Sequence, residues 1–137
     1  MRLLPVGSSN TLAVGESGWI ELSDTFDDRT LFVLTKTRDD RYRIRTARPH
    51  TGGEASCVEV GKAGAVKAVT CDSAKNNQEF EIRRSGPAAY TIRTGKDLFL
   101  TQSLASGVRA IPVRTGEPGK EALFLLPDQG RASAPGP

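Results

Sequence analysis

Residues 57–94 decide the fold, and their informative stretches read Cys57-Val58-Glu59-Val60, Val69-Thr70-Cys71, Asn77-Gln78-Glu79-Phe80 and Tyr90-Thr91-Ile92-Arg93-Thr94. Two of these stretches have counterparts elsewhere in the chain. The last one repeats the pattern of Tyr42-Arg43-Ile44-Arg45-Thr46, and Phe80 recurs as Phe32 and Phe124, at intervals of 48 and 44 residues. A period of this length is typical of repeat architectures. The sequence therefore predicts three copies of one structural unit.

Each copy contains four short candidate strands that are bounded by turn-forming residues. The first copy covers about residues 2–40, with candidate strands at 3–6, 11–14, 19–22 and 31–34. The second covers about 41–88, with strands at 42–46, 57–60, 66–70 and 78–82. The third covers about 89–129, with strands at 90–94, 98–101, 108–113 and 123–126. This pattern predicts a pseudo-threefold all-β domain, although a small sandwich or an irregular barrel also fits it.

Length and charge narrow the possible classes of protein. A chain of 137 residues is enough for one domain, here residues 1–130, and the Pro- and Gly-rich residues 131–137 are expected to form a flexible tail. The net charge of +3 is only slightly positive. The sequence lacks a dense basic patch with interleaved aromatic residues, so it does not predict specific nucleic-acid binding. No apolar run approaches the roughly 20 residues of a membrane-spanning helix, so we expect no membrane insertion.

The second copy carries motifs of a known family. Cys57-Val58-Glu59-Val60, Cys71 and Asn77-Gln78-Glu79-Phe80 resemble the Cys-Leu-Asp-Val-like strand, the second Cys and the Gln-x-Trp motif of the ricin-type β-trefoil family. Tyr90-Thr91-Ile92-Arg93-Thr94 is similar to the strand that opens that family's next repeat. In the other copies the Gln-x-Trp position reads Thr30-Leu31-Phe32 and Ala122-Leu123-Phe124. The resemblance implies a β-trefoil with three pseudo-symmetric four-strand repeats.

The same resemblance implies a non-enzymatic, lectin-like module that binds carbohydrate. In such a family an Asp and an Asn bond sugar hydroxyls, and an aromatic ring stacks on the sugar face. Glu59 stands at the Asp position, and Asn77 and Gln78 stand where the family has Asn and Gln. Val69 replaces the stacking ring. The second copy is thus expected to hold one weak or degenerate sugar site.

The other two copies are not expected to bind sugar in the family's way. By alignment, Leu100 takes the acidic position in the third copy and Ala13 takes it in the first. Neither side chain can accept a hydrogen bond from a hydroxyl group.

The two cysteines have two interpretations. The resemblance implies a Cys57–Cys71 disulfide, which favours secretion into an extracellular, oxidising setting. Residues 1–7 contain no apolar segment of a signal peptide, so a cytoplasmic protein with two free buried thiols remains the alternative. Two cysteines and the single, distant His50 are too few ligands for a metal site, and we expect no metal or cofactor.

A protein-binding β-trefoil, such as a peptidase inhibitor, is the alternative function. Residues 47–56 lengthen the second copy, and Arg48, Pro49 and His50 would form its protein-contact loop. No Ser or Cys nucleophile is recognisably paired with His50, so we expect no catalytic residue and no enzyme activity. The expected partner is a glycan or a protein, the small positive charge neither demands nor excludes an acidic one, and the protein is expected to be a monomer.

Other conspicuous side chains have an ordinary interpretation and a functional one. We expect Phe32, Phe80 and Phe124 in the core because symmetry repeats them. Trp19 is interpreted as a partly buried packing residue, with a stacking platform as the alternative. The densest charge run is interpreted as a solvated strand face or as a patch for an acidic partner, and it comprises Lys36, Arg38, Arg41, Arg43, Arg45 and Arg48.

Overall fold

The computed structural model describes most of the chain between residues 2 and 126. The described ranges are 2–7, 9–15, 18–25, 28–38, 41–46, 56–72, 74–86, 88–95, 97–103, 107–113 and 119–126. The loop with Arg48, Pro49 and His50 and the tail at 131–137 lie outside these ranges.

The described residues form twelve β-strands, four in each predicted copy. Those of the first copy are β1 (Leu4–Pro5), β2 (Thr11–Val14), β3 (Ile20–Ser23) and β4 (Phe32–Arg38). Those of the second are β5 (Arg41–Thr46), β6 (Ser56–Val60), β7 (Val66–Thr70) and β8 (Phe80–Arg84). Those of the third are β9 (Tyr90–Thr94), β10 (Leu98–Ser103), β11 (Gly107–Pro112) and β12 (Phe124–Leu125). All twelve candidate strands overlap an observed strand.

Short 3₁₀ turns were not expected from the sequence, and they correct one predicted strand. Each aromatic strand follows such a turn: η1 (Asp28–Thr30), η3 (Asn76–Gln78) and η4 (Lys120–Ala122), while η2 (Lys62–Gly64) lies in the turn between β6 and β7. Gln78 therefore lies in a 3₁₀ turn and not in the strand that was predicted for residues 78–82. A single turn contains too few residues for a hydrophobic period, so the sequence pattern carries no sign of it.

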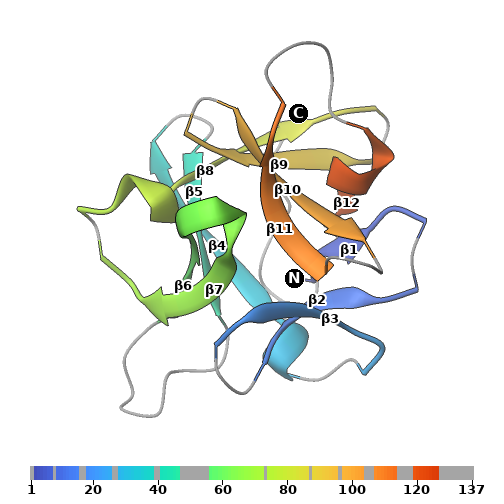
Figure 1. Ribbon diagram of the computed structural model, residues 1–137, viewed down its shortest axis with the longest axis horizontal. Helices are drawn as coiled ribbons and strands as arrows, with labels where there is room; N and C mark the ends of the chain where they lie inside the picture. The colour runs from blue at the N-terminus through green and yellow to red at the C-terminus, as the bar shows by residue number, and fades with distance from the viewer. Residues whose placement is uncertain are drawn as a thin grey trace.

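Among the described residues, one sheet contains every strand except β2 and β3, and six of its strands form a curled central row. Antiparallel pairs join β1 to β12, β12 to β9, β9 to β8, β8 to β5 and β5 to β4. The remaining strands form the hairpins β2–β3, β6–β7 and β10–β11, one from each copy (Figure 1). Six barrel strands with three hairpins in pseudo-threefold order are the β-trefoil arrangement, so the predicted fold is confirmed.

Glycines allow neighbouring hairpins to approach closely. Ala68 of β7 donates its amide hydrogen to the carbonyl oxygen of Gly18, over 2.7 Å. Gly64 has the equivalent place in the second hairpin, and a Cβ added there would lie 2.1 Å from the carbonyl oxygen of Ala110 in β11. Both glycines have positive φ, +87° and +77°. The hairpins therefore interlock backbone to backbone across the copy boundaries.

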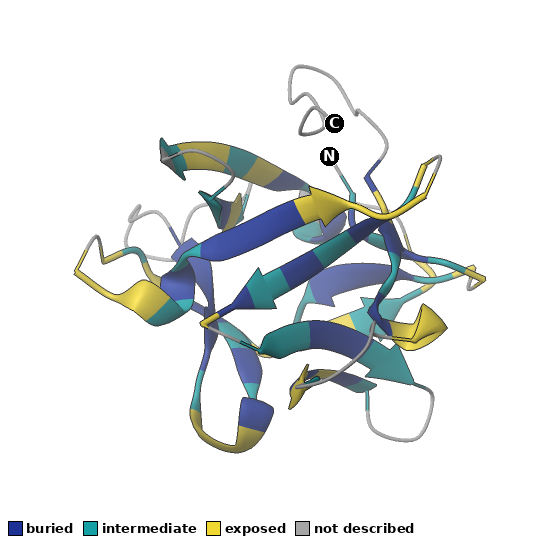
Figure 2. Ribbon diagram, turned by 90° about the horizontal axis from the view of Figure 1, so that it is seen from above, coloured by how far each residue is buried: buried dark blue, intermediate teal, exposed yellow. Residues whose placement is uncertain are grey.

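The aromatic series forms the centre of the core, as predicted. The side chains of Phe32, Phe80 and Phe124 are fully buried, and Ile44 and Ile92 from the matching strands β5 and β9 join them. Figure 2 shows buried segments alternating with more exposed ones along the strands, as the two-residue period of a β-strand requires. Trp19 is 49% exposed, so it is partly buried as predicted, and its accessible surface also leaves the alternative of a stacking platform open.

Cys57 in β6 and Cys71 after β7 form a disulfide, as the family resemblance implied. The bond closes a loop with a sequence separation of 14 residues. In the chain-entropy account, a cross-link stabilises a protein because it restricts the unfolded chain. No free cysteine remains among the residues that the structure describes.

Reduction of this bond is expected to lower the free energy of unfolding by about 3 kcal/mol, the cost for a loop of this length. Urea unfolding with and without a thiol-free reductant measures the change. The double variant Cys57→Ala/Cys71→Ala is the control, and its unfolding should not respond to the reductant. An unchanged unfolding midpoint for the reduced wild-type protein would contradict the expected contribution.

Candidate ligand-binding surface of the second copy

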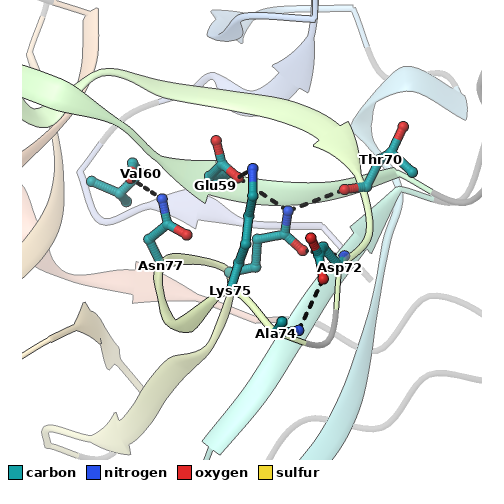
Figure 3. A network of polar contacts seen from close by, with 8 residues as sticks. Glu59, Val60, Thr70, Asp72, Ala74, Lys75 and Asn77 are labelled. Atoms are coloured by element: carbon teal, nitrogen blue, oxygen red, sulfur yellow. Dashed lines mark hydrogen bonds and ion pairs between the residues drawn. The ribbon is translucent and has the colours of Figure 1, made fainter.

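The structure brings the three sugar-site residues predicted from the sequence together. Glu59 lies in β6, and Asn77 and Gln78 lie in η3, which packs against β6. The chain reaches η3 through a tight turn in which the Asp72 carboxylate accepts a hydrogen bond from the Ala74 amide, over 2.9 Å. Figure 3 shows Glu59 and Asn77 near each other, with the Lys75 side chain reaching toward Glu59.

Gln78 has no exposed surface, and its side chain forms hydrogen bonds with three other residues. Its Nε2 group donates to Glu59 Oε1 and to the Thr70 carbonyl oxygen, each over 3.1 Å. Its Oε1 atom accepts a hydrogen bond from the Asp72 amide over 2.8 Å. The equivalent positions Thr30 and Ala122 are fully buried too. Gln78 therefore holds β6, β7 and the following turn together, and its side chain cannot reach a ligand.

Asn77 uses one end of its side-chain amide for the fold and leaves the other end available. Its Nδ2 group donates to the carbonyl oxygen of Val60 over 2.9 Å. The residue is only half-buried, and Oδ1 has no hydrogen-bond donor among the described residues. Because Nδ2 is fixed, the orientation of Oδ1 is fixed as well, so a hydroxyl donor would meet a preorganised acceptor.

Glu59 also has one occupied and one available oxygen. Oε1 accepts hydrogen bonds from Lys75 Nζ and Gln78 Nε2, both over 3.1 Å. Oε2 has no donor among the described residues, and Figure 3 shows it turned away from both partners. The carboxylate is therefore held in place by one oxygen and can accept a hydrogen bond with the other.

The surroundings of Glu59 keep its carboxyl group ionised. Burial raises its pKa, but hydrogen bonds from Gln78 and Lys75 and the positive charges of Lys75 and Lys67 outweigh burial. The pKa of Glu59 therefore lies below its ordinary value of 4.5. A carboxylate with a lowered pKa stabilises the fold above the unfolded-state pKa, and this contribution is lost as the pH falls through the folded-state pKa.

Glu59→Gln is expected to make stability less dependent on pH in the acid range. The free energy of unfolding of the wild-type protein should exceed that of the variant near neutral pH. The difference should shrink as the pH falls from about 6 to about 3, because the wild-type carboxylate then takes up a proton. Urea unfolding of both proteins at several pH values measures this. A difference that grows on acidification would contradict the assigned direction of the pKa shift.

The register of the hairpins corrects one residue in the third copy. Glu59 pairs with Lys67, and the pair at the same hairpin position in β10–β11 is Thr101 with Arg109. Thr101, and not Leu100, therefore takes the acidic position, while Leu100 matches the inward Val58. A shift of one residue moves a side chain to the other face of a strand. Ala13, which pairs with Glu21, keeps its predicted place, so neither copy has an acid at this position.

A ring for stacking is missing within the second copy but present beside it. Val69 pairs with Cys57 and is half-buried, and it offers no aromatic face. Trp19 of the first copy forms an isolated β-bridge with Lys67, which in turn pairs with Glu59. Comparing residues within one copy could not find this neighbour, because it comes from the preceding hairpin.

An acidic side chain, Glu81, lies among the arginines of strands β5, β8 and β9. Arg41 of β5 and Arg93 of β9 both pair with Glu81 of β8, and Glu81 forms ion pairs with Arg83 and Arg93. This carboxylate offsets part of the positive charge. The arrangement fits the solvated strand face better than a dedicated acidic-partner site.

The described ranges support neither a metal site nor a membrane-spanning helix. No three His, Cys, Asp or Glu side chains gather there as a metal ion requires. No helix in these ranges has the length and apolar character needed to cross a membrane.

Comparisons with known proteins show the fold. No protein-family model and no curated protein matches the sequence. Among solved structures, a designed threefold-symmetric protein, ThreeFoil, is similar with a TM-score of 0.71 and 19% identity, over 93% of this chain and 97% of that one. Cry35Ab1 is similar with a TM-score of 0.76 and 16% identity, over 99% of this chain. The chain spans 37% of the length of Cry35Ab1.

Proposed function

We propose that this β-trefoil is a non-enzymatic binding module that recognises carbohydrate through its second copy, in the manner of ricin-type lectins. The observation that carries this proposal is the pair of available acceptors, Glu59 Oε2 and Asn77 Oδ1, each fixed by hydrogen bonds on its other atom. Two fixed acceptors side by side suit the neighbouring hydroxyl groups of a sugar ring. Gln78 positions Glu59 and does not touch the ligand.

The cysteine chemistry supports an extracellular setting for this function. A disulfide such as Cys57–Cys71 persists where the surroundings are oxidising. Extracellular proteins also meet glycans on cell surfaces and in the matrix.

A glycan array followed by titrations of two variants tests the proposal. Asn77→Ala removes a neutral acceptor and should weaken binding about two- to tenfold. Glu59→Gln keeps the shape but removes the charge, and should weaken binding about tenfold. Glu121→Ala is the matched control, because Glu121 takes the place of Asn77 in η4 of the third copy. Thermal unfolding of each variant separates loss of binding from loss of fold.

The alternative, a protein-binding module that uses Arg48, Pro49 and His50, makes a different prediction in the same experiment. It requires that the well-folded protein binds no glycan on the array. It also requires that the protein inhibits a peptidase or binds another protein, and that this activity is lost when a short Gly turn replaces residues 47–56. A blank array would therefore overturn the carbohydrate proposal.

A further inference from the structure

A row of paired residues crosses the boundary between the first and second copies, from the exposed Trp19 through the half-buried Lys67 to Glu59, which is 7% exposed. Trp19 forms a β-bridge with Lys67, and Lys67 pairs with Glu59 on the next strand. Residues that are directly opposite in neighbouring strands share one face of a sheet. Val66 and Ala68, which flank Lys67, are buried, so Lys67 lies on the outer face with Trp19, and Glu59 forms the largely buried end of the row.

Trp19 is held rigidly at one end of this row, although its side chain is exposed. The hydrogen bond from the Ala68 amide to the Gly18 carbonyl oxygen fixes the backbone next to it. The Lys67 ammonium group lies 5.9 Å from the centre of the Trp19 ring. An exposed indole on a fixed backbone offers an apolar platform at little cost in conformational entropy.

Positive charge exceeds negative charge along the row. Lys67 and Lys75 flank Glu59, and only Lys75 forms a hydrogen-bonded ion pair with it. Lys67 forms no hydrogen-bonded ion pair with Glu59 and acts on this carboxylate only through its charge, while its ammonium group lies over the Trp19 ring. A single carboxylate between two ammonium groups leaves one positive charge that an anionic ligand group can neutralise.

We propose that Trp19 supplies the missing stacking ring of the carbohydrate site across the copy boundary, and that Lys67 makes this site select sugars that carry a carboxylate, such as uronic acids. The inference rests on the proposed carbohydrate function. In this arrangement the sugar lies on the indole, its carboxylate meets Lys67, and its hydroxyl groups reach Glu59 Oε2 and Asn77 Oδ1. Two strand spacings separate Trp19 from Glu59, about 10 Å, which a mono- or disaccharide can span.

The other hairpin contact shows why one such site is expected in the described region. The equivalent β-bridge joins Ala65 to Arg109, and Arg109 pairs with Thr101. That row has a cation but neither an aromatic ring nor a carboxylate. Arg109 also donates a hydrogen bond to the Ala63 carbonyl oxygen over 2.7 Å. This second row therefore provides matched control positions, Ala65 for Trp19 and Arg109 for Lys67.

The test compares sugar pairs that differ only in a carboxylate: D-glucuronic acid with D-glucose, and D-galacturonic acid with D-galactose. Trp19 is the sole tryptophan in the sequence, so its fluorescence reports directly on ligand at this position. Affinities of all variants are measured by backbone-amide chemical-shift titration, which does not need the indole. We expect a uronic acid to bind about two- to fivefold more tightly than its neutral partner, the range for an exposed ion pair, with less preference in high salt.

Variants separate the two parts of the inference. Trp19→Ala should weaken binding of both sugars of a pair about fivefold, and Trp19→Phe should keep most of the affinity. Lys67→Met should remove the preference for the uronic acid while neutral-sugar binding persists. Arg109→Met, the control, should change neither.

The outcomes distinguish the inference from the function on which it rests. Sugar binding that depends on Glu59 and Asn77 but survives Trp19→Ala, without a fluorescence change, overturns the stacking role and leaves the proposed function intact. Equal affinity for both sugars of a pair overturns the role of Lys67. The absence of binding by any glycan overturns the proposed function and this inference together.

Discussion

Phe80→Ala is expected to lower the free energy of unfolding by about 3–5 kcal/mol, the range for removing a large aromatic side chain from a core. Phe80 has no exposed surface and lies in the same core cluster as Phe32 and Phe124. Removing its ring leaves a cavity among side chains that come from all three copies. Because the strands around this cluster are hydrogen-bonded into one sheet and cannot move inward independently, the cavity should collapse only in part.

Urea unfolding of the wild-type protein and the variant measures this loss. Ile111→Ala is the control, because Ile111 is also apolar but 43% exposed, and its replacement should change stability by less than about 1 kcal/mol. Phe32→Ala and Phe124→Ala should behave like Phe80→Ala. A loss for Phe80→Ala no greater than that for Ile111→Ala would contradict the central place of the aromatic series.

Gly64→Ala has the second largest expected effect, a loss of about 2–5 kcal/mol. A residue other than glycine costs about 1–2 kcal/mol at a left-handed backbone position such as φ +77°. Overpacking adds about 1–3 kcal/mol, because the new Cβ would lie 2.1 Å from the Ala110 carbonyl oxygen. That oxygen belongs to the backbone of β11, so relief requires the two hairpins to separate.

Gly86→Ala isolates the contribution of this close approach. Gly86 has φ +92°, and a Cβ there would meet no atom within 4 Å. Gly86→Ala therefore has the cost of a side chain at positive φ but not the cost of the steric clash. Urea unfolding of both variants gives the difference between their free energies of unfolding. Equal losses for Gly64→Ala and Gly86→Ala would show that the hairpins do not need this glycine for contact.

Most of the fold could be predicted because the features that repeat are the ones that build the core. Tyr42 and Tyr90, with the three phenylalanines, mark equivalent strands in each copy, and the turn residues between them bound the hairpins. The 3₁₀ turn that holds Gln78 could not be predicted, since three residues carry no periodic signal. The misassignment of Leu100 has a similar cause: strand register depends on pairing across the hairpin, and the sequence of a single strand does not define it.

The candidate site was predicted in part for a related reason. Glu59 and Asn77 are 18 positions apart but belong to one copy, and comparing the copies was enough to associate them. Trp19 belongs to another copy, and its place beside Lys67 depends on how two hairpins meet. Trp19 is also 49% exposed, although burial of the large apolar surface of an indole is usually favourable.

The pairing of β1 with β12 has a consequence for how the chain folds during synthesis. Leu4 and Pro5 pair with Leu125 and Phe124, so β1 cannot pair until a segment about 120 residues further along the chain has been made. Until β12 is available, β1 lacks this strand partner, and its free backbone groups could pair with another chain. Such long-range closure slows folding.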